Sequence, residues 1–217
     1  MIRNPEISII SIVVVGKFNP IIFQPSWLAL KSIIGEIEAN GADVEIIHRE
    51  IVRFKLEWAE IEITSDKFNI KSSKEAYFEP VRDLICSIFT ILNETPIDAV
   101  GINHSMHFQL RNESEFLNFG NFISPLENWK GAFKDPKISN IDLIQNKRND
   151  SFDGMYRLKV QTSDLIKANG VMINLNDHVE FTSKSTKDLI SYLNNNWEVS
   201  AVFNQEILDN LWTKFKK

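Results

Sequence analysis

Two stretches of the sequence place histidine, amide and hydroxyl side chains at alternate positions, as the polar side of a β-strand would. The first, residues 97–110, reads IDAVGINHSMHFQL, and the second, residues 171–181, reads VMINLNDHVEF. At a constant offset of 71 residues, the polar rows correspond: Asn103, Ser105, His107 and Gln109 in the first stretch, and Asn174, Asn176, His178 and Glu180 in the second. We expect the two rows to lie near each other and to form a binding face. Alternating polar residues are also typical of the solvent side of an antiparallel sheet, and that interpretation stays open.

Metal binding is the first chemistry that these residues suggest, because His104 and His107 have the H-x-x-H spacing. On a helix the two side chains would share a face, but on a strand they point to opposite faces. His104 then falls in an apolar row with Ile102 and Met106, which favours a buried histidine bonded to a neighbour over a metal ligand. No carboxylate pattern nearby completes a metal site, so we predict neither a metal nor a cofactor.

Other chemistries lack their characteristic residues. The sequence contains no phosphate-binding P-loop, no G-x-G-x-x-G dinucleotide loop, no H-E-x-x-H and no G-x-S-x-G. Cys86 is the single cysteine and lies inside an amphipathic helix, where an inert packed thiol is the common case. These absences favour a non-enzymatic protein without catalytic residues.

The charge balance limits the class of partner. The chain has 24 Lys and Arg against 29 Asp and Glu, a formal net charge of −5, and no long basic run. Such a balance argues against a nucleic-acid partner. The apolar residues 7–15 are too few to span a bilayer as a helix and lack a signal-peptide cleavage motif. With a single cysteine, the sequence therefore predicts a cytoplasmic protein that does not associate with a membrane.

Hydrophobic periodicity predicts an α+β fold. Residues 7–15 are apolar on both faces, which suits a strand that is covered from both sides. Residues 44–70 alternate with a period of two, as hairpin strands with one dry face do. Residues 27–39 and 81–92 follow the helical period, and Pro80 suits the first turn of the second helix.

The order of these elements predicts two related halves of mostly antiparallel sheet with packed helices. The first half, residues 1–112, has the order of a ferredoxin-like βαββαβ unit. Residues 113–136 form a helical, aromatic-rich connector, in which Phe119, Phe122 and Trp129 are candidate interface anchors. The second half, residues 137–217, is interpreted as three strands followed by two helices, the second of which Asn204 caps.

Three segments resemble those of a sporadically distributed family of uncharacterised bacterial proteins built of two α+β halves. They are the early apolar strand leading into a proline-containing loop, the strand DAVGINHSMHF, and VMINLNDHVEF followed by helices that end in NQEILDNLWTKF. The middle strand departs from the family where Gly101, Ile102, Asn103 and His104 replace an Arg-x-x-Asn-like ending. The resemblance implies the fold and a bacterial cytoplasm, and it implies no catalytic residues. A sporadic distribution is typical of mobile-element, toxin–antitoxin or phage-defence cargo.

These observations favour a non-enzymatic protein that binds a protein partner or a second copy of itself. The resemblance adds the role of an accessory or regulatory component of a bacterial phage-defence or toxin–antitoxin-type system. The alternative is a metal-dependent hydrolase or nuclease that uses His107 and His178. The sequence leaves open the identity of the partner and whether a small molecule binds.

Overall fold

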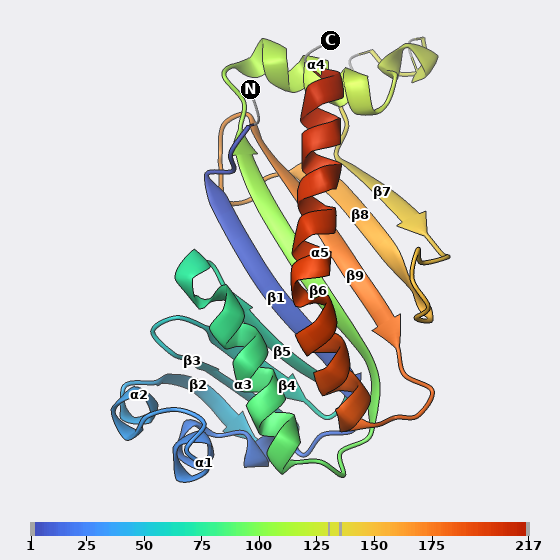
Figure 1. The fold of residues 1–217 in the computed structure, drawn as a ribbon. Coiled ribbons are helices and arrows are strands. Elements are labelled where there is room, and N and C mark those ends of the chain that lie inside the picture. Colours follow the sequence, from blue (N-terminus) through green and yellow to red (C-terminus); the bar gives the residue numbers. More distant parts are fainter. Residues whose placement is uncertain (1–2, 130, 135, 216–217) are drawn as a thin grey trace.

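The strands predicted from period-two alternation join into one antiparallel sheet in the computed structural model, which describes residues 3–129, 131–134 and 136–215. The nine strands formed by these residues follow the order β2-β3-β4-β5-β1-β6-β9-β8-β7 across the sheet. Their bounds are β1 Ile7–Gly16, β2 Asp43–His48, β3 Ile51–Lys55, β4 Glu60–Thr64, β5 Lys67–Ser72, β6 Ile97–Gln109, β7 Asn140–Gln145, β8 Gly154–Thr162 and β9 Gly170–Glu180. The apolar strand β1 therefore lies in the middle of the sheet (Figure 1).

Two long helices cover one face of the sheet. Helices α3 (Phe78–Ile91) and α5 (Thr186–Phe215) pack against each other and lie on the same side of it (Figure 1). The shorter helices are α1 Pro25–Leu30, α2 Glu36–Asn40 and α4 Glu113–Ile123, with the 3-10 helices η1 Pro20–Ile22, η2 Glu75–Tyr77 and η3 Leu126–Trp129. We call the covered side the helix face and the opposite side, on which no described helix packs, the open face.

The sequence of α3 explains why this helix packs against the sheet. Its buried residues recur at helical spacing and are Val81, Leu84, Ile85, Ile88 and Phe89. Pro80 stands in the first turn, where its missing N–H needs no partner. The predicted helix is confirmed.

Helix α5 spans two hydrophobic clusters with one buried stripe. At helical spacing the stripe contains Leu189, Leu193, Trp197, Ser200, Asn204, Leu208 and Trp212. Its first three members belong to a large cluster that also contains residues of β1, β3 to β6 and α3. Its last two belong to a smaller cluster that contains Phe108 and Phe119. Between the clusters the buried positions are the polar Ser200 and Asn204.

The predicted closing pair of helices is wrong, because residues 186–215 form the single helix α5. Asn204, predicted to cap a second helix, is only 3% exposed in the helix interior. The apolar period is interrupted at Ser200, which meets His104 of the sheet, and at Asn204, but the helix does not end there. Residues 27–39 also differ from the prediction, since they contain the end of α1 and most of α2 rather than one continuous helix.

The predicted α+β class with a mostly antiparallel sheet is confirmed. The strands of residues 1–112 and of residues 137–217 nevertheless share one continuous sheet, because β9 pairs with β6 along the whole length of β9. The structure therefore shows neither two separate halves nor a ferredoxin-like unit. Periodicity identifies which residues are strands, but the pairing of strands depends on contacts between distant parts of the chain. None of the described helices combines the length and the apolar character that crossing a membrane requires, and even the long α5 is too polar.

The smaller hydrophobic cluster yields a test of how α5 is placed. Trp212 is 2% exposed, and its ring lies 5.1 Å from that of Phe119. We expect Trp212→Ala to lower the free energy of unfolding by about 3–5 kcal/mol, measured by urea unfolding, because it leaves a cavity. The control is Val199→Ala on the same helix, 61% exposed, which should change stability by less than about 0.5 kcal/mol. Equal stability losses in the two variants would contradict this placement.

Candidate functional site

The two polar rows lie side by side on the open face, because β6 and β9 are neighbours. Their pairing is antiparallel, so Asn103 stands opposite Asn176, and Ser105 stands opposite Asn174. Asn176 Nδ2 donates a hydrogen bond of 2.8 Å to Asn103 Oδ1, and Asn174 Nδ2 donates one of 2.6 Å to Ser105 Oγ. The fold thus brings the two rows together. The constant offset matches Asn103 with Asn174, but the antiparallel pairing places Asn103 opposite Asn176.

A glycine makes room for this pairing. A Cβ atom at Gly101 would lie 2.7 Å from the Asn176 amide nitrogen, closer than nonbonded atoms approach. Any larger residue would therefore push the amide away from Asn103. The glycine of the GIN segment supports the amide pair on the open face.

The two histidines of the rows lie apart. His178 stands opposite Gly101, whereas His107 stands opposite Met172. Six residues of strand separate these two positions along β6, which corresponds to roughly 20 Å. His178 has Glu180 as its neighbour, with Nε2 3.7 Å from Oε1. The structure therefore does not bring His107 and His178 together as ligands or as a catalytic pair.

The loop between β8 and β9 covers the His107 end of the row. His107 is 2% exposed, and its Nδ1 lies 2.8 Å from Ser163 Oγ. Burial lowers the pKa of His107, against the opposing charge of Asp164. Gln109 Nε2 donates to the carbonyl oxygens of Leu110 and, in the loop, Ala168. His107 is the buried member of the rows, whereas the central amides, Gln109 and the His178 end remain at least partly open.

An apolar row follows the central strand on the open face. Ile7, Ile9, Val13 and Val15 alternate with the fully buried residues of the helix face, and each is half-buried. Ser11 interrupts the row beside Asn103. The pattern predicted a strand covered from both sides, yet helices cover only one side within the described residues (Figure 1). We call Ile7, Ile9, Val13 and Val15 the β1 row.

Paired charges flank the β1 row on both sides. Toward β2, Arg53 donates from Nε to Glu62 Oε2 at 2.6 Å. Toward β7, Arg157 donates two hydrogen bonds of 2.6 Å to the carboxylate oxygens of Asp142. Because these opposite charges sit on neighbouring strands, they offset each other. The middle of the open face therefore combines apolar and amide groups with little net charge.

His104 lies on the opposite, helix face. It is 5% exposed, and its Nε2 lies 3.1 Å from Ser200 Oγ of α5. Burial lowers the pKa of His104 to about 4, against the opposing charge of Asp177. It is a buried histidine bonded to a neighbour, as its place in the apolar row predicted. Within the described residues, no three His, Cys, Asp or Glu side chains are arranged to hold a metal ion.

A buried ionic cluster lies beside His104, centred on Arg148 of the loop before β8. Arg148 is 6% exposed and donates from Nη1 to Asp177, which is 2% exposed. Through Nε and Nη2 it also donates to both carboxylate oxygens of Asp150, at 2.9 and 2.7 Å. The hydroxyl of Tyr192 on α5 donates to Asp177 Oδ1 at 2.9 Å, and the Tyr156 ring centroid lies 4.3 Å from the guanidinium carbon.

These contacts keep Arg148 and the two tyrosines protonated near neutral pH. Burial alone would lower the pKa of Arg148, but its hydrogen bonds to Asp150 and Asp177 raise it above the ordinary value. Burial raises the pKa of Tyr156 to about 12 and raises that of Tyr192 as well. Both hydroxyls therefore stay protonated and cannot act as bases near neutral pH. The sequence analysis missed this cluster, although Asp177 is an acid in a mostly apolar row and so required a buried cation.

The candidate anchors of the aromatic connector differ in exposure. Phe119 is 1% exposed, because it packs against Trp212 and Phe215 in the smaller hydrophobic cluster. It serves the core and presents no surface to a partner. Phe122 and Trp129 are 39% and 53% exposed, so these two remain candidate anchors.

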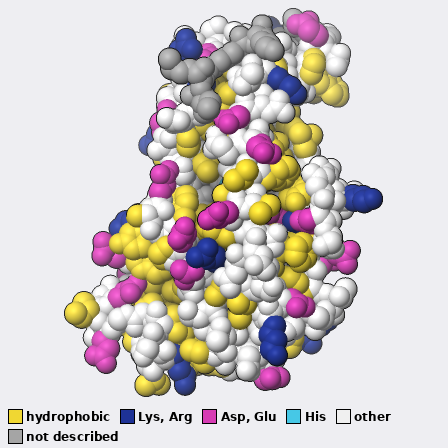
Figure 2. Space-filling model, in the orientation of Figure 1, with side chains coloured by type: hydrophobic (Ala, Val, Ile, Leu, Met, Phe, Trp, Pro, Cys, Tyr) yellow, Lys and Arg dark blue, Asp and Glu magenta, His cyan; other side chains and the backbone are white. Residues whose placement is uncertain are grey.

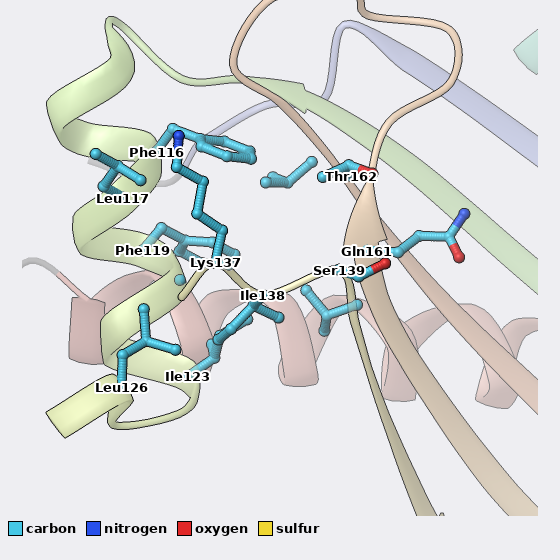
Figure 3. Close-up of a pocket in the computed structure, with 13 residues that line it drawn as sticks. Phe116, Leu117, Phe119, Ile123, Leu126, Lys137, Ile138, Ser139, Gln161 and Thr162 are labelled. Atoms are coloured by element: carbon cyan, nitrogen blue, oxygen red, sulfur yellow. The ribbon is translucent and has the colours of Figure 1, made fainter. Parts of the chain in front are cut away.

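A cavity lies between α4, residues 137–139 and the sheet (Figure 3). Phe116, Phe119 and Ile123 reach it from α4, Ile138 faces them, and Lys137 extends across it. Its volume of about 30 Å³ has room for one or two water molecules and not for an organic ligand. We interpret it as a packing gap beneath the connector.

No family model matches this sequence, and no curated protein shows significant similarity to it. The functional argument therefore depends on the geometry of the chain. The open face offers apolar surface and amide groups, which bind by contact and hydrogen bonding. Its one strongly buried histidine, His107, is held by the covering loop.

The buried cluster predicts a large stability effect at Arg148. We expect Arg148→Leu to lower the free energy of unfolding by about 3–5 kcal/mol, because it leaves Asp177 buried without its cation. Urea unfolding measures the loss. Arg157→Leu is the matched control, since it breaks an equally well-formed but exposed pair with Asp142 and should cost less than about 1 kcal/mol. Similar losses of stability in both variants would contradict the burial of the Arg148 cluster.

The lowered pKa of His104 predicts a pH dependence. The unfolded histidine takes up a proton near pH 6.5 and the folded one only near pH 4, so stability is full above pH 6.5 and falls as the pH drops toward 4. Between pH 7 and pH 4.5, the free energy of unfolding should fall by about 2 kcal/mol less in His104→Gln than in the wild-type chain. Urea unfolding at both pH values measures the difference. The control His48→Gln, at an exposed position, should follow the wild-type chain. An unchanged pH dependence in His104→Gln would contradict the buried neutral histidine.

Proposed function

We propose that this chain is a non-enzymatic protein-binding module that acts through the open face of its sheet. One observation supports this most directly: the β1 row is apolar where a solvent-facing strand is ordinarily polar, and no described helix covers it. Following the resemblance, the module serves as an accessory or regulatory component of a bacterial phage-defence or toxin–antitoxin-type system.

The chemistry of the open face defines the kind of partner. Its centre joins the β1 row to the amide pairs of Asn103 with Asn176 and of Ser105 with Asn174. Interfaces commonly combine an apolar centre with a hydrogen-bonding surround. Arg53 and Glu62, like Arg157 and Asp142, are already paired within the chain, so a strongly charged partner gains little from these groups. We infer a folded protein with a flat, mostly uncharged surface.

The size of the open face suits such a partner. Nine strands about 4.8 Å apart span roughly 38 Å, and a strand of six residues, such as β2, β5 or β7, is about 20 Å long. The projected area is therefore of order 750 Å², close to the roughly 800 Å² that each partner contributes to a standard interface. A surface of this size supports a stable complex without help from other parts of the chain.

The test replaces two members of the β1 row and measures partner binding. In Ile9→Thr/Val13→Thr, threonine keeps the β-branched shape that suits a strand and removes apolar surface. We expect at least a tenfold loss of co-purifying partner from the native host, by quantitative mass spectrometry. The matched control is Leu30→Thr/Ile37→Thr, which changes two aliphatic residues, 77% and 91% exposed, away from the open face.

The possible outcomes separate the alternatives. A stoichiometric partner that the β1-row variant loses and the control retains supports the proposal. A dimer in sedimentation analysis that dissociates only in the β1-row variant identifies the partner as a second copy of the chain. A monomer with no stoichiometric partner, or equal binding by all variants, would refute the role of the open face.

A further inference from the structure

The middle of α5, on the helix face, carries an exposed apolar ridge. Val199 and Val202 are 61% and 57% exposed, at positions where a solvated helix ordinarily carries polar residues. They lie on the side of α5 that faces away from the sheet, since the buried stripe passes through Ser200. The ridge stands between two hollows of the surface, one on each side of the helix.

The first hollow, of about 500 Å³, lies between α5 and the region of β8 and the Arg148 loop. Its walls include the aromatic rings of Tyr156 and Phe203, whose centroids are 4.6 Å apart. The second hollow, of about 770 Å³, lies between α5 and the start of α3. Phe78 and Trp197 contribute to its lining, and Val202 lines both hollows.

Carboxylates dominate the charged groups of both hollows. The acids among the lining residues are Asp150, Asp177, Glu198 and Glu206 in the first hollow and Glu75, Glu79, Asp83 and Glu198 in the second. These are seven different carboxylates, and the one cation among the lining residues is Arg148, so the lining carries a formal charge of −6. The whole chain carries −5. The net negative charge of the protein is therefore concentrated around this apolar ridge.

Three of the seven carboxylates are paired with arginines of the chain, and four are not. Arg148 is bonded to Asp150 and Asp177. Arg82 lies beside the second hollow, where it pairs with Asp83 and stands over the Trp197 ring. Glu75, Glu79, Glu198 and Glu206 form no ion pair among the described residues. Figure 2, which views this side of the molecule, shows Asp and Glu side chains, with a Lys or Arg side chain among them, beside hydrophobic ones over the middle of the helix layer.

The combination of apolar ridge and acidic hollows selects one kind of occupant. Nucleic acid and anionic membrane surfaces are repelled by this charge. A basic amphipathic helix suits it, because apolar side chains at helical spacing can contact the ridge while Lys or Arg side chains reach the carboxylates on either side. Such charge complementarity also raises the rate of association.

We propose that the middle of α5, with the hollows on its two sides, is a docking surface for a positively charged amphipathic helix of a partner protein. The ridge residues Val199 and Val202 contact its apolar face. Glu79 and Glu198 bind its Lys or Arg side chains. This surface lies on the opposite side of the sheet from the open face, so it is independent of the function proposed above and would let the chain hold two partners at once.

The test titrates the full chain into a fluorescein-labelled peptide of about 16 residues, with Leu on one helical face and Lys on the other. Fluorescence anisotropy measures the Kd. A peptide of the same composition, shuffled so that the helical pattern is lost, should bind at least tenfold more weakly. A peptide with Glu in place of Lys should not bind.

Two double variants with the same change in charge locate the site. Glu79→Gln/Glu198→Gln should weaken binding of the amphipathic peptide at least fivefold. Glu36→Gln/Glu94→Gln removes two exposed carboxylates elsewhere and should leave the Kd within twofold. Val202→Ser should weaken binding by a similar factor without a change in net charge, and urea unfolding checks that each variant is folded.

Equal affinity for the ordered and shuffled peptides would overturn the proposal, because it would indicate non-specific attraction to an acidic protein. Equal effects of the two double variants would overturn it as well. Loss of peptide binding in Ile9→Thr/Val13→Thr but not in Val202→Ser would place the peptide on the open face instead. None of these outcomes affects co-purification through the open face, so the two proposals fail separately.

Discussion

One helix, α5, has to cover a sheet face that is apolar toward both ends of the helix and polar in between. Leu193 and Trp212 bury apolar surface in two separate hydrophobic clusters. In the stretch between them, Ser200 meets His104, and Asn204 is buried as well. Because burial of an unpaired polar group costs more than burial of an apolar one, the match of Ser200 with His104 favours one position of the helix, although Asn204 Oδ1 is buried without a hydrogen-bond partner. This match sets the position of α5 along the sheet.

The buried Arg148 cluster extends the same polar zone to the edge of α5. Arg148 arrives from a loop, Asp177 from β9 and Tyr192 from α5, so the three parts of the chain are joined at one point. Removing one member leaves the others buried without a partner, which is why such a cluster specifies a single arrangement. The same cluster forms one wall of the first acidic hollow, where Asp150 and Asp177 outnumber the guanidinium.

The two faces of the sheet then offer different chemistry to partners. The open face is broad, nearly uncharged at its centre and bears amides that are bonded to each other. The helix face is narrow at its apolar ridge and strongly acidic around it. A flat neutral surface and a basic amphipathic helix are recognised by different forces, burial of area in the first case and charge with apolar contact in the second.

The sequence by itself determined the local elements. Period-two alternation predicted the hairpin strands, and helical spacing from Val81 to Phe89 predicted α3. The apolar row around His104 predicted a buried histidine bonded to a neighbour. These predictions succeed because side-chain direction depends on the local backbone alone. The sequence also indicated that the two polar rows are related, because polar residues alternate in the same way along the segments that form β6 and β9.

Only the tertiary structure decided how these elements combine. The pairing of β6 with β9 placed Asn103 opposite Asn176 and separated His107 from His178, because antiparallel neighbours run in opposite directions. The continuity of α5 past Ser200 was likewise decided by tertiary contacts, since Ser200 meets His104 of β6, which lies far away in the sequence. Whether the β1 row is covered was likewise beyond the local pattern, because a strand that is apolar on both sides does not encode what lies against each side.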